Sequence, residues 1–456
     1  MDQAPAPLFE VTSYTISSLL ITACVIAGVA GCSFLLKRTP FRYWIYLFLI
    51  GVPFDLGAPL GYIPRISVID YLSLAGLIAI LLKFSSREII AKVKASFGWP
   101  LLCSWFVYLL YDAVSGLILH GSFKGVFRWG ETLFVYWIAV LAVQEDRKRL
   151  AESAGWILTG LGALMAAWAL IQYVRSGLNY TLTYAIFEQH NILGAYLSLC
   201  LPVSWVIAMT RSTKSFRIAG GMLSGLITIS FLAAYSRGAW LGLLGALILI
   251  FVLSWQKLRS PVFSLSVGFL LILAGAAAPI SWIRYREHLG RPPIVDSLSF
   301  DVHQALSDHT RIFTTSQRAY YWKAASDIFR EHPLMGLGPK NFDSQISGYL
   351  IGRAKTIYVE DLQFNGRVNF WQHLHNEYLQ VLVENGLIGL ILWAAAFSLL
   401  ALPLFRADIL GSNPLFCAFQ VSGLAFILHN SVDILFVNSL DIVFVILIAI
   451  LRQAEI

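Results

Sequence analysis

The stretch HNEYLQVLVENGLIGLILWAAAFSLLALPL, residues 375–404, joins a polar turn to a long apolar run. A run of about 20 apolar residues is long enough to cross the hydrocarbon core of a bilayer as one helix. The turn before it carries a histidine, a carboxylate and two amides, at His375, Glu377, Asn376 and Gln380. We therefore predict a membrane-spanning helix that begins at a polar rim, where His375 can take or give a proton near neutral pH.

The composition of the whole chain points the same way. Of its 456 residues, 57% are apolar and only 13% are charged, and the mean hydropathy is +0.69. A soluble protein carries roughly a quarter charged residues. Similar apolar runs recur along most of the chain, so the sequence predicts an all-α, polytopic helical membrane protein. The net charge of +7 does not indicate nucleic acid binding, because the basic residues form short clusters between the apolar runs.

The apolar runs predict about 13 membrane spans, or about 12 if the weak second run is not counted. Pro53, Asp55 and Pro59 interrupt that run. The first span is expected to stay as an anchor, because the N-terminus lacks the basic residues of a cleavable signal peptide. The predicted spans are 15–36, 41–58, 66–82, 98–119, 127–143, 154–174, 190–209, 217–234, 239–255, 262–283, 376–404, 413–431 and 434–451.

Basic clusters between the spans indicate which loops face the cytoplasm, since such loops are enriched in lysine and arginine. Clusters at 211–217 and 256–259 face inward, so the junction at Ser236 and Arg237 faces outward. The next span delivers residues 284–375 to that same outer face. The same count predicts an N-terminus outside and a C-terminus inside.

This topology divides the chain into three parts. Residues 1–283 are expected to form an N-terminal bundle of about ten spans, and residues 376–456 about three more spans. Residues 284–375 are expected to form one large loop at the outer face. Apolar side chains at helical spacing predict an amphipathic helix near 317–330 within it, which Pro333 ends.

Two arginines on the outer side are candidate anion-binding residues. Arg237 sits at a tight turn between apolar helices, where it needs either an anion or a position at the interface. Arg318 belongs to the loop helix and, considered alone, is typical of a solvated surface. If the two converge, they suit a diphosphate, because a guanidinium group binds phosphate oxygens in a bidentate manner.

Other polar residues at the outer face have both a structural and a functional interpretation. Asn191 and His375 can serve as helix-start residues or can contact a substrate. Asp433 can lie in a plain turn or act as a functional carboxylate. His303 and His309 lie near acidic residues, but their spacing fits no common metal-ligand pattern. No DxD, GxxxxGK[ST] or GxSxG motif occurs, so we expect no metal and no cofactor.

The motifs resemble those of the O-antigen ligase and O-antigen polymerase superfamily of bacterial envelope glycan transferases. The ligase pattern H-[NSQ]-x9-G-x-x-[GTY] is met by His375, Asn376, Gly386 and Gly389. The resemblance covers residues 190–450 well. Its other matches are Arg237 and Leu241 in R-x3-L, the segment from Arg318 to Phe342 in the periplasmic-loop signature, Asn191 in the outer-face asparagine motif, and Asp433 after the penultimate span.

The resemblance implies a metal-independent, inverting glycosyltransferase in the bacterial inner membrane, with its site facing the periplasm. Its donor would be a glycan on undecaprenyl diphosphate, and its acceptor a glycolipid such as lipid A-core. His375 would be the general base on the acceptor hydroxyl, and Arg237 and Arg318 would hold the diphosphate. Asn191, Asn376 and Asp433 would position these groups.

Alternatives remain within and outside this class. A polymerase of O-antigen or exopolysaccharide, or a protein O-oligosaccharyltransferase of the same superfamily, would share the donor chemistry and the outer site. A transporter of lipid-linked glycans is a further alternative, but transporters often show paired repeats and ionisable residues at mid-membrane. No repeat is visible here, and the candidate residues gather at one face.

Overall fold

The computed structural model describes residues 27–55, 58–60, 63–178, 182–187, 189–210, 213–254, 315–352, 363–364, 367–368, 373–406, 413–436 and 439–452. The predicted span 262–283, part of span 15–36, and both His303 and His309 lie outside these residues. Within them, two short antiparallel hairpins accompany the helices. The hairpins pair β1 (Ala58–Leu60) with β2 (Ile63–Ile66) and β3 (Gln363–Phe364) with β4 (Arg367–Val368).

Helices lie before, within and after the predicted outer loop. The earlier ones are α2 (Phe41–Gly51), α3 (Val68–Lys83), α4 (Ser86–Ile118), α5 (Lys124–Arg175), α6 (His190–Thr210), α7 (Lys214–Ala233) and α8 (Arg237–Ser254). The later ones are α11 (Thr315–Glu331), α12 (Phe342–Gly352), α13 (Glu377–Ala401), α14 (Pro414–His429) and α15 (Leu440–Arg452). Two 3-10 turns, η1 (Val52–Phe54) and η5 (Leu402–Phe405), continue α2 and α13. The helix predicted near 317–330 is α11.

Within the described residues, five helices are long and apolar enough to cross a membrane: α4, α5, α6, α7, and α13 continued through η5. Three shorter apolar helices accompany them, at Phe41–Phe54, Arg237–Leu253 and Pro414–His429. A helix satisfies its own backbone hydrogen bonds, which is what a span without water requires. The predicted all-α, polytopic membrane fold is confirmed.

Two elements differ from the predicted boundaries. α5 is 52 residues long and covers the predicted spans 127–143 and 154–174, which a non-helical Asp146 separates within it. α15 begins at Leu440 rather than at 434. Ile434 and Leu435 are not helical, and their N–H groups donate to Asp433 Oδ1 at 3.0 Å and Asn430 Oδ1 at 2.9 Å. Ser439, directly before α15, has a left-handed φ of 58°, so the helix starts after it.

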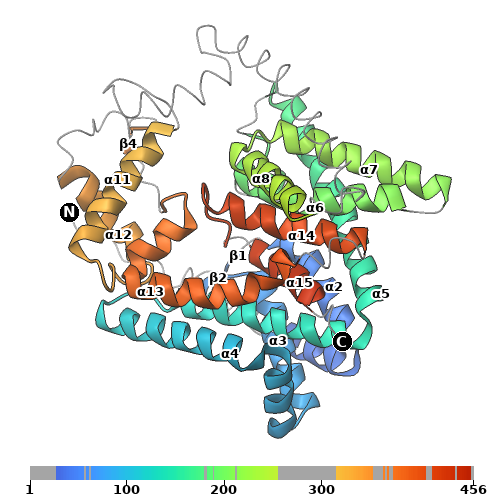
Figure 1. Ribbon diagram of the computed structural model, residues 1–456, viewed down its shortest axis with the longest axis horizontal. Helices are drawn as coiled ribbons and strands as arrows, with labels where there is room; N and C mark the ends of the chain where they lie inside the picture. Colours follow the sequence, from blue (N-terminus) through green and yellow to red (C-terminus); the bar gives the residue numbers. More distant parts are fainter. Residues whose placement is uncertain are drawn as a thin grey trace, which may run out of the picture.

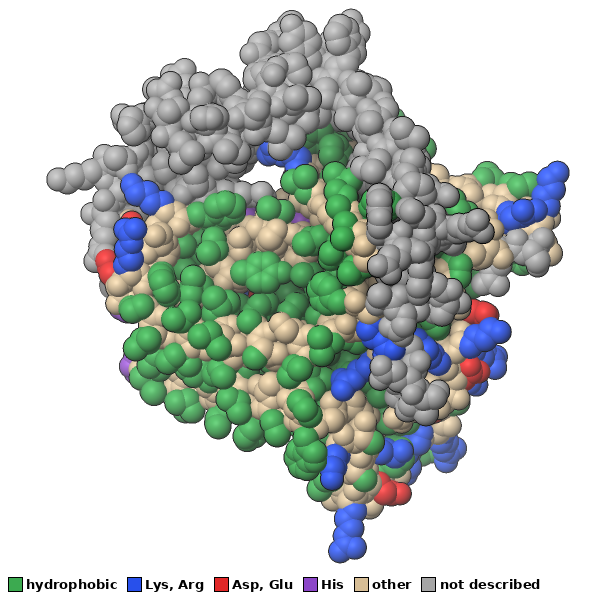
Figure 2. All heavy atoms as spheres, in the orientation of Figure 1, with side chains coloured by type: hydrophobic (Ala, Val, Ile, Leu, Met, Phe, Trp, Pro, Cys, Tyr) green, Lys and Arg blue, Asp and Glu red, His purple; other side chains and the backbone are tan. Residues whose placement is uncertain are grey.

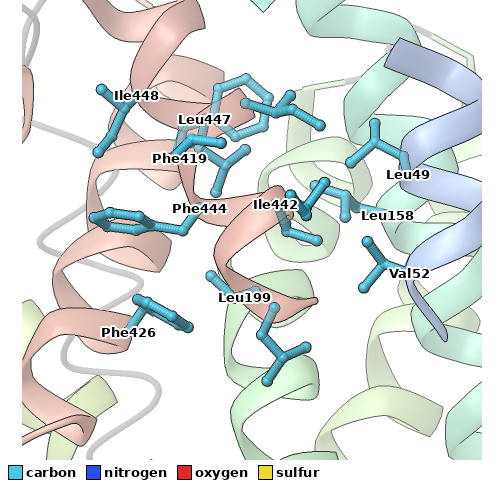
Figure 3. Packing of buried hydrophobic residues seen from close by; sticks show 14 of the residues in the cluster. Leu49, Val52, Leu158, Leu199, Phe419, Phe426, Ile442, Phe444, Leu447 and Ile448 are labelled. Carbon is cyan, nitrogen blue, oxygen red and sulfur yellow. The ribbon is translucent and has the colours of Figure 1, made fainter. Parts of the chain in front are cut away.

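The core gathers around α14 and α15, which other helices surround (Figure 1). α15 is buried along nearly its whole length. Its Phe444 stacks on Phe426 of α14 with ring centroids 4.8 Å apart, while Leu199 of α6 and Val52 of η1 complete the same cluster (Figure 3). A fully buried central helix explains why this run is apolar on every side.

The outer surface is apolar as well. Figure 2 shows hydrophobic side chains over much of one face, with Lys and Arg at its margins. Large exposed side chains include Leu81, Phe106, Phe127, Met222 and Ile391. A soluble monomer rarely exposes so broad an apolar surface, whereas a lipid bilayer would cover it.

α13 is broken, and the break receives a loop. Gly386 has φ 65° and ψ −171°, so the helix cannot continue through it. The loop that follows α11 supplies the missing hydrogen-bond partners, as the N–H groups of Leu337 and Gly338 donate to the carbonyls of Val383 and Glu384, each at 2.9 Å. In return, the loop carbonyls of Pro333 and Leu334 accept from the N–H groups of residues 387 and 388. The outer loop is therefore attached to α13 by backbone bonds.

Candidate functional site

Two turns hold the start of α13 in place. Asn376 is the N-cap of α13, and its Oδ1 accepts from the Leu379 N–H at 3.0 Å. Its amide Nδ2 donates to the Ser431 carbonyl at 2.7 Å, and the Glu377 N–H donates to the Asn430 carbonyl at 3.0 Å. The turn that starts α13 is thereby bonded to the turn that follows α14. Asn376 acts here as a structural cap that also joins the two turns.

The same two turns bring a histidine to a carboxylate. His375 Nδ1 and Asp433 Oδ1 lie 2.9 Å apart, and both side chains are buried. His375 adopts a left-handed φ of 50°, which a non-glycine residue rarely does without support from its surroundings. A carboxylate that accepts from Nδ1–H fixes the tautomer with the lone pair on Nε2. The pair therefore has the arrangement of a general base with an orienting acid.

His373 lies beside this pair, with its ring centroid 4.6 Å from that of His375. Burial lowers the pKa of His373 to about 4, and the nearby His375 acts in the same direction. His373 is therefore neutral at neutral pH. His373, His375 and Asp433 offer ligand atoms within 4.8 Å of one another, a set that suits a transition metal such as Zn²⁺. The expectation that no metal takes part stays a prediction.

Small residues bring Arg237 to the same end of the bundle. α8 lies against α14 because Gly238 and Gly242 leave room: a Cβ at Gly238 would be 2.5 Å from the His429 ring, and one at Gly242 2.7 Å from the Ala425 carbonyl oxygen. Arg237 starts α8 just where α14 ends, and the turn that carries Asp433 follows α14 directly. The half-buried Arg237 is thus placed beside the end of the bundle that holds His375.

Asn191 lies next to the Arg237 turn. It is the second residue of α6, and the preceding His190 Nδ1 is 3.0 Å from the Ala234 carbonyl. One turn later, a Cβ at Gly194 would lie 2.5 Å from that of Ser236. The start of α6 and the start of α8 are therefore in close contact, and the positioning role expected for Asn191 stays a prediction.

Arg318 lies in α11, and its side chain is outside what the structure describes. One helical turn later, Trp322 Nε1 donates to the Leu374 carbonyl at 3.0 Å. Arg318 precedes Trp322 by about one turn of α11, so its backbone lies about one turn from this contact. The helix that carries Arg318 therefore contacts the residue before His375.

The sequence interpretation missed a second group of polar residues beside α13. Asp112, Glu384, Asn385 and Lys340 line one recess together with Glu377. Asp112 offered one signal, because it is an ionisable residue inside the predicted span 98–119. Burying such a residue in a membrane costs free energy, so it often marks a functional site. Lys340 gave no comparable signal, since a lysine in an outer loop is ordinary.

The fold and the site define a multi-pass membrane protein with its polar residues collected at one end of the helices. Residues 222–394 match the family model described as O-Antigen ligase. This match confirms the resemblance to the O-antigen ligase superfamily, and it spans Arg237, Arg318 and His375. It supports a glycan-transferring membrane enzyme of the ligase or polymerase type, which requires lipid-linked glycan and acceptor substrates. No curated protein matches the chain significantly.

Proposed function

We propose that the protein is an O-antigen ligase-like glycosyltransferase of the bacterial inner membrane. It transfers a glycan from undecaprenyl diphosphate to an acceptor hydroxyl at the periplasmic face, such as one on lipid A-core. The observation that carries the proposal is the 2.9 Å contact between His375 and Asp433 at the start of α13. A buried base with a fixed tautomer is what activation of a sugar hydroxyl requires.

The reaction is a single displacement. His375 Nε2 takes the proton of the acceptor hydroxyl while that oxygen forms a bond to the anomeric carbon of the donor sugar. The bond from the anomeric carbon to the diphosphate oxygen breaks on the opposite side, so the configuration inverts. Undecaprenyl diphosphate leaves with the electron pair, and Asp433 stabilises the imidazolium that forms.

Arg237 and Arg318 stabilise the leaving group in this scheme. Guanidinium groups bind diphosphate oxygens in a bidentate manner, and their charge opposes the negative charge that develops as the bond breaks. Asn191 orients the donor in this scheme, which the contact of α6 with α8 supports, and Asn376 orients the base through its two turn contacts. No step requires a nucleotide sugar or a metal.

The three parts of the chain have distinct roles in this proposal. Residues 1–283 and 376–456 supply the transmembrane scaffold, and residues 284–375 cover the periplasmic side of the site. The bonds between the loop and the broken α13 support such a division, because they hold the loop next to the start of the same helix.

The test replaces His375 by alanine in the native host and follows the ladder of polymer on its acceptor. We expect loss of attached glycan while long lipid-linked chains accumulate. Loss of the long chains themselves would indicate a polymerase, and loss of glycan from a protein would indicate an O-oligosaccharyltransferase. His332→Ala is the matched control, because His332 is an exposed histidine of the same loop. Unchanged attachment and chain length in His375→Ala would overturn the proposal.

A further inference from the structure

A polar recess of about 70 Å³ lies between α4, α5, α13 and the residues around Lys340. A cavity needs roughly 10–15 Å³ to hold one water molecule, so this one has room for several hydroxyl groups. Among the described residues that line the recess, Lys340 is exposed, and the others are buried or half-buried. The recess therefore opens beside Lys340, on the side of the outer loop.

Part of the polar lining is already hydrogen-bonded. Asn385 Nδ2 donates to Asp112 Oδ1 at 2.9 Å, and Gln380 Nε2 donates to Glu384 Oε1 at 2.7 Å. These bonds hold two carboxylates in fixed orientations. Elsewhere in the lining, Arg128 pairs with Asp441 at 2.7 Å and also with Glu131 at 3.1 Å.

Three other polar atoms of the lining have no such partner among the described residues: Asp112 Oδ2, Glu377 Oε2 and Asn385 Oδ1. All three side chains are at least nine-tenths buried, with exposed fractions of 3%, 8% and 4%. Buried polar atoms are nearly always hydrogen-bonded. Gly125 keeps space next to Asp112, because a Cβ there would be 3.0 Å from Oδ2. These acceptors need donor hydrogens from whatever occupies the recess.

The charges of the recess limit the class of occupant. Glu384 raises the pKa of Lys340 most, followed by Glu377 and Asp112, so this lysine is charged. Three carboxylates face one ammonium, which disfavours a diphosphate. The ammonium itself disfavours a metal cation. A neutral group that both donates and accepts hydrogen bonds satisfies both conditions, and adjacent hydroxyls on a sugar ring do so.

Aromatic side chains form the apolar part of the lining. Trp129, Tyr108 and Phe436 line the recess, and the rings of Trp129 and Phe436 lie 4.9 Å apart. Binding sites for small polar ligands commonly combine such apolar walls with a few fixed polar groups. Here the aromatic rings can contact the C–H face of a sugar while the carboxylates take its hydroxyl hydrogens.

We infer that this recess binds a neutral sugar of the acceptor glycan, through Asp112, Glu377 and Lys340. The inference rests on the proposed function and deepens it. The acceptor is favoured over the donor because the carboxylates would repel the diphosphate that the first donor sugar carries. Glu377 also follows His375 by two residues, so the recess and the proposed base are both formed at the start of α13.

The first experiment measures binding without catalysis. The full-length protein in nanodiscs is mixed with neutral methyl glycosides, and ligand contact is followed by saturation-transfer NMR. We expect contact in the wild-type protein, with affinity at least about tenfold lower in Asp112→Asn and in Lys340→Met. The exposed Lys323→Met should bind as the wild type does. No contact, or equal contact in both recess variants, would overturn the inference.

The second experiment measures transfer. With purified lipid-linked donor and the host's lipid A-core, Asp112→Asn should raise the acceptor KM about tenfold, while kcat and the donor KM change less than about twofold. An increase in the donor KM instead would show that the recess serves the donor. The proposed base and the proposed sugar recess can fail independently. If His375→Ala still transfers glycan, the base assignment is wrong, whether or not the recess binds methyl glycosides. Melting temperatures equal to that of the wild type show that each variant folds.

Discussion

Gly386 of α13 lies against the carbonyl of Leu334, so closely that any Cβ at residue 386 would overlap the Leu334 oxygen. The glycine also has φ 65° and ψ −171°, a region that residues with a Cβ essentially do not occupy. This contact is where the outer loop enters the broken helix. The glycine of the H-[NSQ]-x9-G pattern thus joins the loop to the helix that carries the proposed base.

Replacing Gly386 by alanine should therefore separate the loop from α13. We expect destabilisation of at least about 1–3 kcal/mol from backbone strain alone, with the steric overlap added to it. The measurement is the melting temperature in detergent. Gly225→Ala in α7 is the control, because a Cβ there meets nothing within 4 Å. Equal melting temperatures for both variants would show that the break in α13 is not required.

The prediction of the helical class is confirmed, and most predicted spans coincide with helices, because both depend on local composition. The site residues were selected by motif and stay predictions. The sequence could not predict which residues meet. His375 and Asp433 are 58 positions apart and touch only because two turns are bonded together. Lys340 and Asp112 share a recess through the packing of α4 against α13, which no local pattern encodes.

The position at which α15 begins shows the same limit of prediction from sequence. Its apolar run extends from 434 in the sequence, but Ile434 and Leu435 are not helical, and Ser439 has a left-handed φ of 58° that a helix cannot contain. Hydropathy reports how apolar a segment is and not which backbone conformation its residues adopt.

Replacing Asp433 by asparagine should slow glycan transfer, although His375, the proposed base, is unchanged. An amide can donate to Nδ1, which would place the imidazole proton on Nε2 and abolish its function as a base. We expect kcat to fall about 10²–10⁴-fold with little change in the donor KM. Steady-state kinetics on the purified protein check this, with the exposed Asp343→Asn as control. A variant with wild-type kcat would contradict the proposed pair.

Arg237 should act on the donor rather than on the acceptor. Arg237→Gln removes a cation from the diphosphate, and we expect kcat/KM for the donor to fall about 10²-fold. Arg237→Lys keeps the charge but loses the bidentate geometry, so its loss should be intermediate. Arg217→Gln serves as the control, because Arg217 is an exposed arginine near the start of α7. Equal losses in Arg237→Lys and Arg237→Gln would favour geometry over charge, and no loss in either would remove Arg237 from the site.

His373 predicts a pH dependence of stability. Its pKa falls from 6.5 to about 4 on folding, so the unfolded chain binds more protons between these values. The stabilisation is present above pH 6.5 and is lost as the pH falls toward 4, by on the order of 2–3 kcal/mol. Melting temperatures measured from pH 7 to pH 4.5 should therefore fall less in His373→Gln than in the wild type. Parallel curves for the two proteins would contradict the half-buried, neutral state of His373.

Chelation decides between the base and a metal at the histidine turn. His373, His375 and Asp433 could together ligate an ion, whereas the proposed displacement needs only the lone pair of His375. We expect transfer by the purified protein to persist after EDTA dialysis, and added Zn²⁺ to inhibit by occupying these ligands. Loss of activity on dialysis with recovery on adding Zn²⁺ would replace the general-base mechanism by a metal-assisted one. His373→Gln then sharpens the result, since it removes one ligand but leaves the pair of His375 and Asp433 intact, and a base mechanism should tolerate it.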